Sequence, residues 1–151
     1  MKRNWMMFFA LAFFLASCGV KAPPLPPEFV VPERIRDLEA RVEEGAVTLK
    51  WTAPKESTDK TEMSDLKGFR VLRKAVPDSG VDCPPCSGSF EEIANFTLVD
   101  LKGAVAKGDK IYYRDASIEP GITYTYAVIS YNEDLYESEF SNTIEVHLQQ
   151  R

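Results

Sequence analysis

The chain of 151 residues lacks most of the side chains on which enzymes depend. His147 is its only histidine, which rules out most Ser-His and Cys-His nucleophilic schemes unless folding brings that imidazole to a nucleophile. None of the eight glycines forms a phosphate-cradling loop, and the acidic residues show no pairing that singles out a catalytic site. We therefore expect a protein that binds rather than catalyses, with no catalytic residues.

An excess of positive charge is also missing. The chain has 18 Lys+Arg against 23 Asp+Glu, which gives a formal net charge of -5. An acidic surface argues against nucleic acid as a partner, because the phosphate backbone selects basic surfaces. No internal repeat or long low-complexity run is present. The roughly 120 residues after position 32 suit one domain with one core.

Long apolar runs are absent apart from one near the N-terminus. Residues 5–15 are apolar throughout, but a transmembrane helix needs roughly 20 such residues. Lys2 and Arg3 precede this run, and the small residues Ala16 and Ser17 lead into Cys18. This order is typical of a secretory signal peptide, so residues 1–17 are predicted to be cleaved.

The stretch Leu15-Ala16-Ser17-Cys18 resembles the lipobox of bacterial lipoproteins. The resemblance implies a diacylglyceryl thioether on Cys18, cleavage before it, and a further acyl chain such as palmitate on the new amine. Two or three acyl chains make a stable membrane anchor, whereas one binds marginally. Gly19 replaces the Asp that retains enterobacterial lipoproteins in the inner membrane, which favours the outer membrane of a Gram-negative cell. The alternative is an ordinary secretory signal with a chance cysteine.

Residues 18–32 form a proline-rich tether. Five prolines in this segment exclude a helix or a central strand and favour an extended spacer of roughly 40 Å. Its beginning, Cys18 to Pro27, resembles the Cys-Gly-x-Lys-Gly-Pro start of small lipoproteins that associate with the lipopolysaccharide translocon, although Ala22 replaces the Gly. That resemblance implies an assembly factor for the translocon, and the alternative is a spacer without a partner.

Residues 33–149 have the pattern of one β-domain. Val47, Leu49 and Trp51 are separated by single polar residues, so one face of that strand is apolar. Short strands at such spacing, with no helical stretch, predict an antiparallel β-sandwich. The other expected strands are 35–42, 69–74, one or two within 90–99, 111–115, 123–131 and 141–148.

Five segments in this domain resemble successive landmarks of the fibronectin type III family: Arg36 to Ala40, Val47 to Pro54, Gly68 to Val71, Ile118 to Tyr124, and Glu137 to Asn142. The resemblance implies an immunoglobulin-like sandwich of about seven strands. It makes Trp51 a core residue and Tyr124 the tyrosine of a corner whose hydroxyl returns to upstream backbone. Ile122 replaces the threonine that is usual in that corner.

An insertion at about 75–90 interrupts the resemblance and contains Cys83 and Cys86. Because Cys18 is assigned to lipid, an even pair remains for an oxidising compartment, and a small disulfide that closes the loop is expected. Thiol–disulfide exchange is the alternative, although Asp82 raises a thiol pKa and no thioredoxin-like pattern surrounds the pair. No metal site is expected, because zinc needs four ligands, and Ser87 replaces the histidine of a haem motif.

Three functional hypotheses therefore stand for a lipid-anchored envelope protein with no cofactor. It is an interaction module for another envelope protein, an assembly factor for the translocon, or a thiol-exchange protein that uses Cys83 and Cys86. Binding of a glycan is a variant of the first, for which four tyrosines are available: Tyr112, Tyr113, Tyr131 and Tyr136.

Overall fold

The structure is a computed structural model that describes residues 30–78 and 89–148. These residues contain eight β-strands: β1 (Glu39–Glu43), β2 (Ala46–Thr52), β3 (Leu66–Pro77), β4 (Glu91–Thr97), β5 (Val105–Lys107), β6 (Lys110–Asp115), β7 (Ile122–Asn132) and β8 (Ile144–His147).

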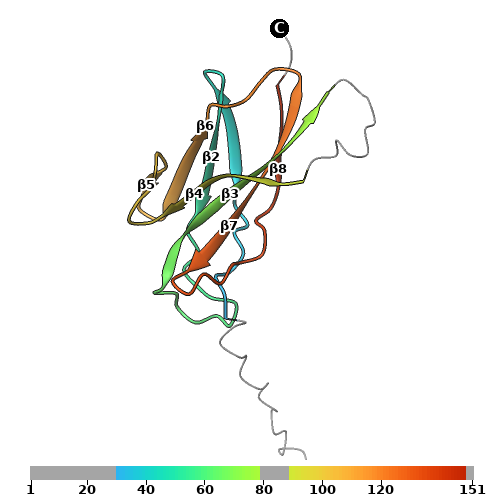
Figure 1. The fold of residues 1–151 in the computed structure, drawn as a ribbon. Helices are drawn as coiled ribbons and strands as arrows, with labels where there is room; N and C mark the ends of the chain where they lie inside the picture. The colour runs from blue at the N-terminus through green and yellow to red at the C-terminus, as the bar shows by residue number, and fades with distance from the viewer. Residues whose placement is uncertain (1–29, 79–88, 149–151) are drawn as a thin grey trace, which may run out of the picture.

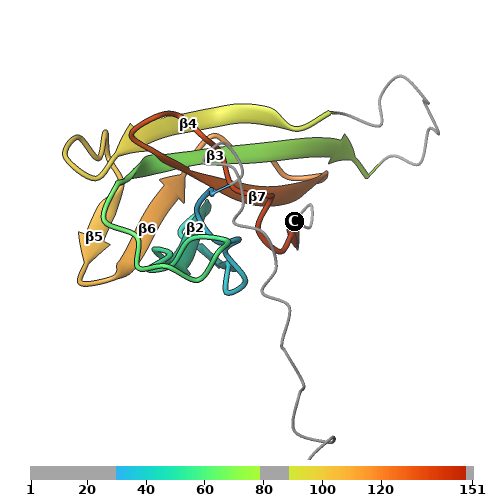
Figure 2. The ribbon, with the colours of Figure 1, turned by 90° about the horizontal axis from the view of Figure 1, so that it is seen from below.

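The strands form two antiparallel sheets that pack face to face. One sheet has the order β1-β2-β6-β5 and the other the order β4-β3-β7-β8. Figure 2 shows the two layers from below, with β3, β4 and β7 above β2, β5 and β6. The described chain begins at the bottom of Figure 1, in blue, and the red strand β8 ends near the top. The expected all-β sandwich is therefore confirmed.

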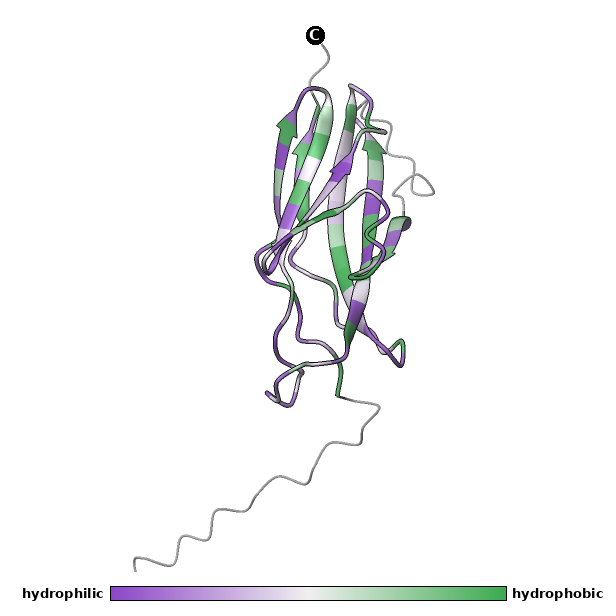
Figure 3. Cartoon of the chain, turned by 90° about the vertical axis from the view of Figure 1, so that its left-hand side faces the viewer, coloured by the Kyte–Doolittle hydropathy of each residue, from purple (hydrophilic) through white to green (hydrophobic). Residues whose placement is uncertain are grey.

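The core lies between the two sheets and is built by residues that alternate along the strands. In β2, Val47, Leu49 and Trp51 are fully buried, as the period of two requires. Trp51 meets Phe69 of β3 edge to face, with ring centroids 5.5 Å apart, and lies 6.3 Å from the ring of Phe96 in β4. Green and purple bands alternate along the strands in Figure 3, which is the pattern expected for strands with one apolar and one polar face.

Local backbone chemistry fixes two of the strand pairings. Glu44 and Gly45 both have positive φ, at 50° and 72°, and close a two-residue turn between β1 and β2. Such a turn matches the twist of the flanking strands. In β3, Gly68 allows β4 to approach closely, because a Cβ there would lie 2.3 Å from the carbonyl oxygen of Phe96.

Several strand bounds differ from the sequence prediction. The sequence places the end of the third strand at Lys74, but β3 continues to Pro77 because β7 pairs with it that far. The first strand begins at Glu39 rather than Ile35, although Ile35 is buried just before it. Residues 90–99 hold the single strand β4, and the short β5 follows where no strand is expected. Regular pairing, which the sequence pattern does not report, sets these bounds.

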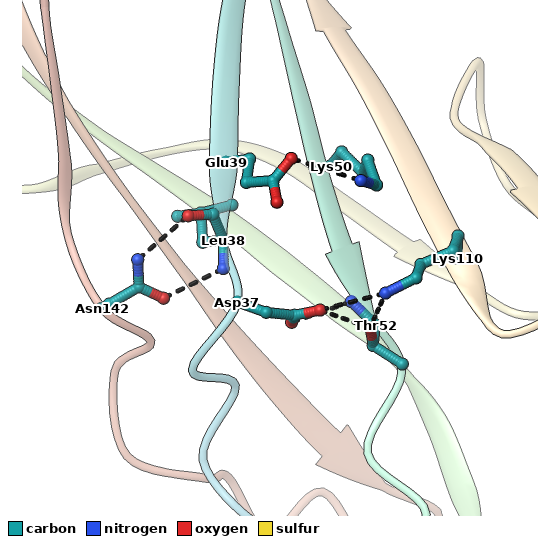
Figure 4. A network of polar contacts seen from close by, with 7 residues as sticks. All are labelled: Asp37, Leu38, Glu39, Lys50, Thr52, Lys110 and Asn142. Atoms are coloured by element: carbon teal, nitrogen blue, oxygen red, sulfur yellow. Dashed lines mark hydrogen bonds and ion pairs between the residues drawn. The ribbon is translucent and has the colours of Figure 1, made fainter.

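Side chains close the gap between the edges of the two sheets. The amide of Asn142, just before β8, donates to the carbonyl of Leu38 at 3.0 Å and accepts from its N–H at 3.0 Å, as Figure 4 shows. Nearby, Asp37 accepts hydrogen bonds from the Thr52 backbone and hydroxyl and from Lys110. Burial by itself raises the pKa of Asp37, but these hydrogen bonds outweigh it and leave the pKa below its usual value.

Candidate binding surface

The outer face of the β4-β3-β7-β8 sheet carries apolar residues where a two-layer sandwich usually turns polar. Leu72 in β3, and Ala127 and Ile129 in β7, point away from the core yet are 6%, 0% and 6% exposed. Their strand neighbours Val71, Tyr126 and Val128 point inward and are also buried. The two middle strands are therefore buried on both faces, which makes this outer face a second, smaller apolar cluster.

Two phenylalanines lie over this cluster. Phe90, just before β4, packs against it, and the ring of Phe140 lies 5.7 Å from the ring of Phe90. Phe140 belongs to the connection between β7 and β8 and remains 47% exposed. A large aromatic ring that is half exposed above a buried apolar cluster has the character of a contact residue for another molecule.

An arginine lies between two carboxylates beside the cluster. Arg70 of β3 donates from Nε to Glu92 of β4 and from Nη1 to Glu137, which follows β7. The hydrogen bond to Glu92, followed by that to Glu137, raises the pKa of the Arg70 guanidinium. These two contacts neutralise Arg70 and hold three segments of the sheet together.

Two shallow hollows meet at Glu137. One, of about 550 Å³, extends from Arg70 and Tyr131 to Leu135 in the turn after β7. The other, of about 490 Å³, lies beside Phe140. Leu135 is 63% exposed and has a φ of 67°, a conformation that costs a bulky residue energy. We call this area the binding surface, defined by Arg70, Glu92, Tyr131, Leu135, Glu137 and Phe140.

The side chains of the binding surface are suited to contact with another molecule. Tyr131 is 6% exposed and donates to the Oδ1 of Asn95 at 2.9 Å, so its hydroxyl is already bound. Leu135 and Phe140 are the exposed apolar groups of this surface, on either side of the ion pairs of Arg70. Within residues 30–78 and 89–148 there is no group of three or more His, Cys, Asp or Glu side chains that could hold a metal ion. The same residues include no helix long and apolar enough to cross a membrane.

The residues singled out in the sequence are either buried in the domain or lie outside the described residues. Trp51 is fully buried in the core, and its Nε1 has no hydrogen-bond partner among the described residues. Tyr124 is 3% exposed, and its hydroxyl accepts a hydrogen bond of 2.9 Å from the backbone N–H of Glu119. Neither contributes to the binding surface. Cys18, Cys83 and Cys86 lie outside the described residues.

A buried polar network joins the two sheets near Tyr124. Asp115, at the end of β6, is 3% exposed and accepts from Arg73 of β3 at 2.7 Å and from the Tyr126 hydroxyl at 2.9 Å. Ser117 donates to the same carboxylate from its N–H and its hydroxyl. Burial raises the pKa of Asp115, but the hydrogen bonds led by Ser117 lower it below its usual value. Burial, followed by the bond to Asp115, raises the pKa of Tyr126.

The binding surface is not among the features predicted from the sequence, although the sequence contains one signal for it. Val71 is followed directly by Leu72, and residues 126–129 are apolar without interruption. Such runs break the alternation of a strand with one wet face and indicate strands buried on both faces. The partners of Arg70 leave no comparable trace, because Glu137 lies 67 positions away in the chain.

Solved structures resemble the whole sandwich. The third fibronectin III domain of the human KIAA0343 protein matches with a TM-score of 0.54 and 14% identity, over 88% of this chain and 94% of that one. The fold is a fibronectin type III-like β-sandwich. The twitchin kinase region from C. elegans matches this fibronectin-like domain with a TM-score of 0.52 and 16% identity, over 78% of this chain and 17% of that one. No family model matches the chain. A search of curated proteins finds no match either.

Proposed function

We propose that the protein is a lipid-anchored interaction module of the bacterial cell envelope, held to the outer membrane through Cys18. The order of Lys2 and Arg3, the apolar run and the lipobox-like Leu15 to Cys18 supports the anchor. The fibronectin-like fold supports a non-enzymatic role only in a general way, because one fold serves many functions.

The observation that carries the proposal is the binding surface. Its half-exposed Phe140 and Leu135 flank the neutralised Arg70 and lie beside two hollows. A partner can bury these apolar groups without leaving Arg70 unpaired, and its own polar groups can meet the one negative charge in excess on Glu92 and Glu137. The occupant we propose is another envelope protein, whose apolar side chains fill the hollows and whose polar groups meet Glu92 and Glu137.

The anchor is tested by metabolic labelling with a palmitate analogue in cells that express the full chain. We expect the wild type to carry the label and to sediment with membranes, and Cys18→Ser to lose both properties. Cys83→Ser is the matched control, because it removes a thiol elsewhere and should keep the label. Labelling that survives in Cys18→Ser would show that the anchor is misassigned.

Partner binding is tested separately by crosslinking in intact cells followed by isolation of the full chain. Phe140→Ser should reduce the recovery of the crosslinked protein about tenfold, because truncating an interface aromatic often costs about 1.4 kcal/mol or more. Val105→Ser is the control, since Val105 is also 47% exposed but lies on the other sheet.

Leu135→Asn distinguishes loss of contact from loss of folding. Asn tolerates the positive φ at this position better than Leu, so this variant should fold at least as well as the wild type. If Phe140→Ser and Leu135→Asn both retain the crosslink at the wild-type level, the binding surface is not where the partner docks.

A second candidate function, assembly of the lipopolysaccharide translocon, is favoured by the resemblance of Cys18 to Pro27. It predicts that deleting residues 20–27 abolishes crosslinking to the translocon barrel while Phe140→Ser leaves it intact. Thiol–disulfide exchange by Cys83 and Cys86 predicts loss of function in either Cys→Ser variant. Asp82 and the two intervening prolines argue against it, because exchange requires a thiol with a lowered pKa.

A further inference from the structure

The outer face of the other sheet, β1-β2-β6-β5, carries two exposed arginines in line with each other. Arg41 of β1 and Arg114 of β6 pair in register with Thr48 of β2 from its two sides, so the three residues form one row across the sheet. Both arginines are exposed, and neither forms an ion pair within the described part of the chain. Their Cα atoms are separated by two strand spacings, about 10 Å, within which two guanidinium groups can reach one anion.

Two lysines on this face are already engaged in ion pairs. Lys50 pairs with Glu39 at 3.2 Å, and Lys110 pairs with Asp37 at 3.2 Å, as Figure 4 shows. The two arginines and the exposed Lys107 are therefore the cations of this face that remain available for a ligand.

A hollow of about 340 Å³ lies beside this row. Its lining combines an aromatic ring, a hydroxyl, cations and carboxylates from three adjacent strands: Glu39, Arg41, Glu43, Thr48, Lys50 and Tyr112. Lys50 stands in register with Tyr112, so the ring lies next to the row that contains Thr48. Lys107 lies over the same ring, with Nζ 5.5 Å from its centroid, and can move aside because it is exposed.

We infer that this face binds a saccharide that carries phosphate or carboxylate groups. The anionic group is held by Arg41 and Arg114, with the Thr48 hydroxyl between them. The carboxylates of Glu39 and Glu43 accept hydrogen bonds from sugar hydroxyls and would repel a bare inorganic anion. Tyr112 offers its ring to the apolar face of the sugar. The site lies on the opposite side of the sandwich from the binding surface, so it does not depend on the proposed protein partner.

The test measures binding of fluorescent oligosaccharides to the purified full chain by anisotropy. The probes are a glucuronate tetrasaccharide, a hexose phosphate disaccharide and the neutral maltotetraose. We expect one or both acidic probes to bind, with an affinity that falls as salt is raised from 50 to 300 mM, and maltotetraose to bind at least tenfold more weakly. The two acidic probes distinguish carboxylate from phosphate as the preferred group.

Variants assign the binding to the arginines. Arg41→Gln and Arg114→Gln should each weaken binding of the acidic probe about tenfold, and the double variant more than either. Arg36→Gln, which removes an exposed arginine before β1, should bind as the wild type does. Binding of neither acidic probe, equal binding of maltotetraose, or wild-type affinity in the double variant would each overturn the inference.

Discussion

Replacement of Asp115 by Asn is the sharpest test of how the two sheets are held together. Asp115 is the only carboxylate within hydrogen-bonding distance of Arg73, Tyr126 and Ser117 among the described residues. Asn has nearly the same shape but no charge, so the variant leaves the positive guanidinium of Arg73 without its partner. The side chain of Arg73 is only 18% exposed, so water replaces the lost contact poorly.

The size of the effect follows from this burial. Removing one partner of a buried ion pair lowers the free energy of unfolding by about 3–5 kcal/mol. Arg73 keeps a hydrogen bond of 2.9 Å to the carbonyl of Ser117 and its position 5.2 Å from the ring centroid of Tyr124, which places the expected loss at the lower end. We therefore predict that Asp115→Asn lowers the free energy of unfolding by about 3 kcal/mol, a large share of the 5–15 kcal/mol of a typical domain.

The same contacts make this loss depend on pH. Because the folded pKa of Asp115 lies below the unfolded value of about 3.8, its contribution is fully present above that value. The contribution disappears as the pH falls below about 4 and through the lowered folded pKa. The stability difference between the wild type and Asp115→Asn should therefore be largest at neutral pH and shrink towards pH 3.

Urea unfolding followed by tryptophan fluorescence measures both quantities, because Trp51 is buried in the core. A double-mutant cycle with Arg73→Met and the double variant isolates the interaction energy between Arg73 and Asp115, which we expect to be about 2 kcal/mol. A loss below 1 kcal/mol in Asp115→Asn, or a loss that is the same at pH 7 and pH 3, would refute the reasoning that the pair is buried and ionised.

Three further predictions concern the backbone and the sheet edges. Gly68→Ala should destabilise the fold by about 2 kcal/mol or more in urea unfolding, because the new Cβ would lie 2.3 Å from the carbonyl oxygen of Phe96. Asn142→Ala should cost about 2 kcal/mol, since the backbone of Leu38 loses both hydrogen bonds; an unchanged unfolding midpoint would contradict that role. Glu44→Asn should instead raise the free energy of unfolding by about 0.5–1 kcal/mol, because Asn suits the positive φ of the turn, and a higher melting temperature would show this gain.

The sequence predicts the sandwich well because its main signals are local. Alternation places Val47, Leu49 and Trp51 in the core, and all three are fully buried. The lengths of the strands are predicted less well, because they depend on pairing partners. β3 runs to Pro77 since β7 is long enough to pair with it, and β7 begins 45 residues after β3 ends. No local pattern around Lys74 reports that partner.

The row of Arg41, Thr48 and Arg114 can be predicted only in part from the sequence. Alternation alone places Arg41, Thr48 and Arg114 on outward faces, because each is one residue away from an inward one. Alternation does not show that the three residues lie in one row. If the pairing of two strands shifted by two residues, each side chain would stay on the same face of the sheet, but the three residues would no longer be aligned. The Glu44-Gly45 turn fixes the register of β1 against β2, so the neighbourhood of Arg41 and Thr48 follows from a two-residue signal. The position of Arg114 instead depends on pairing across 66 residues, which only the assembled sheet determines.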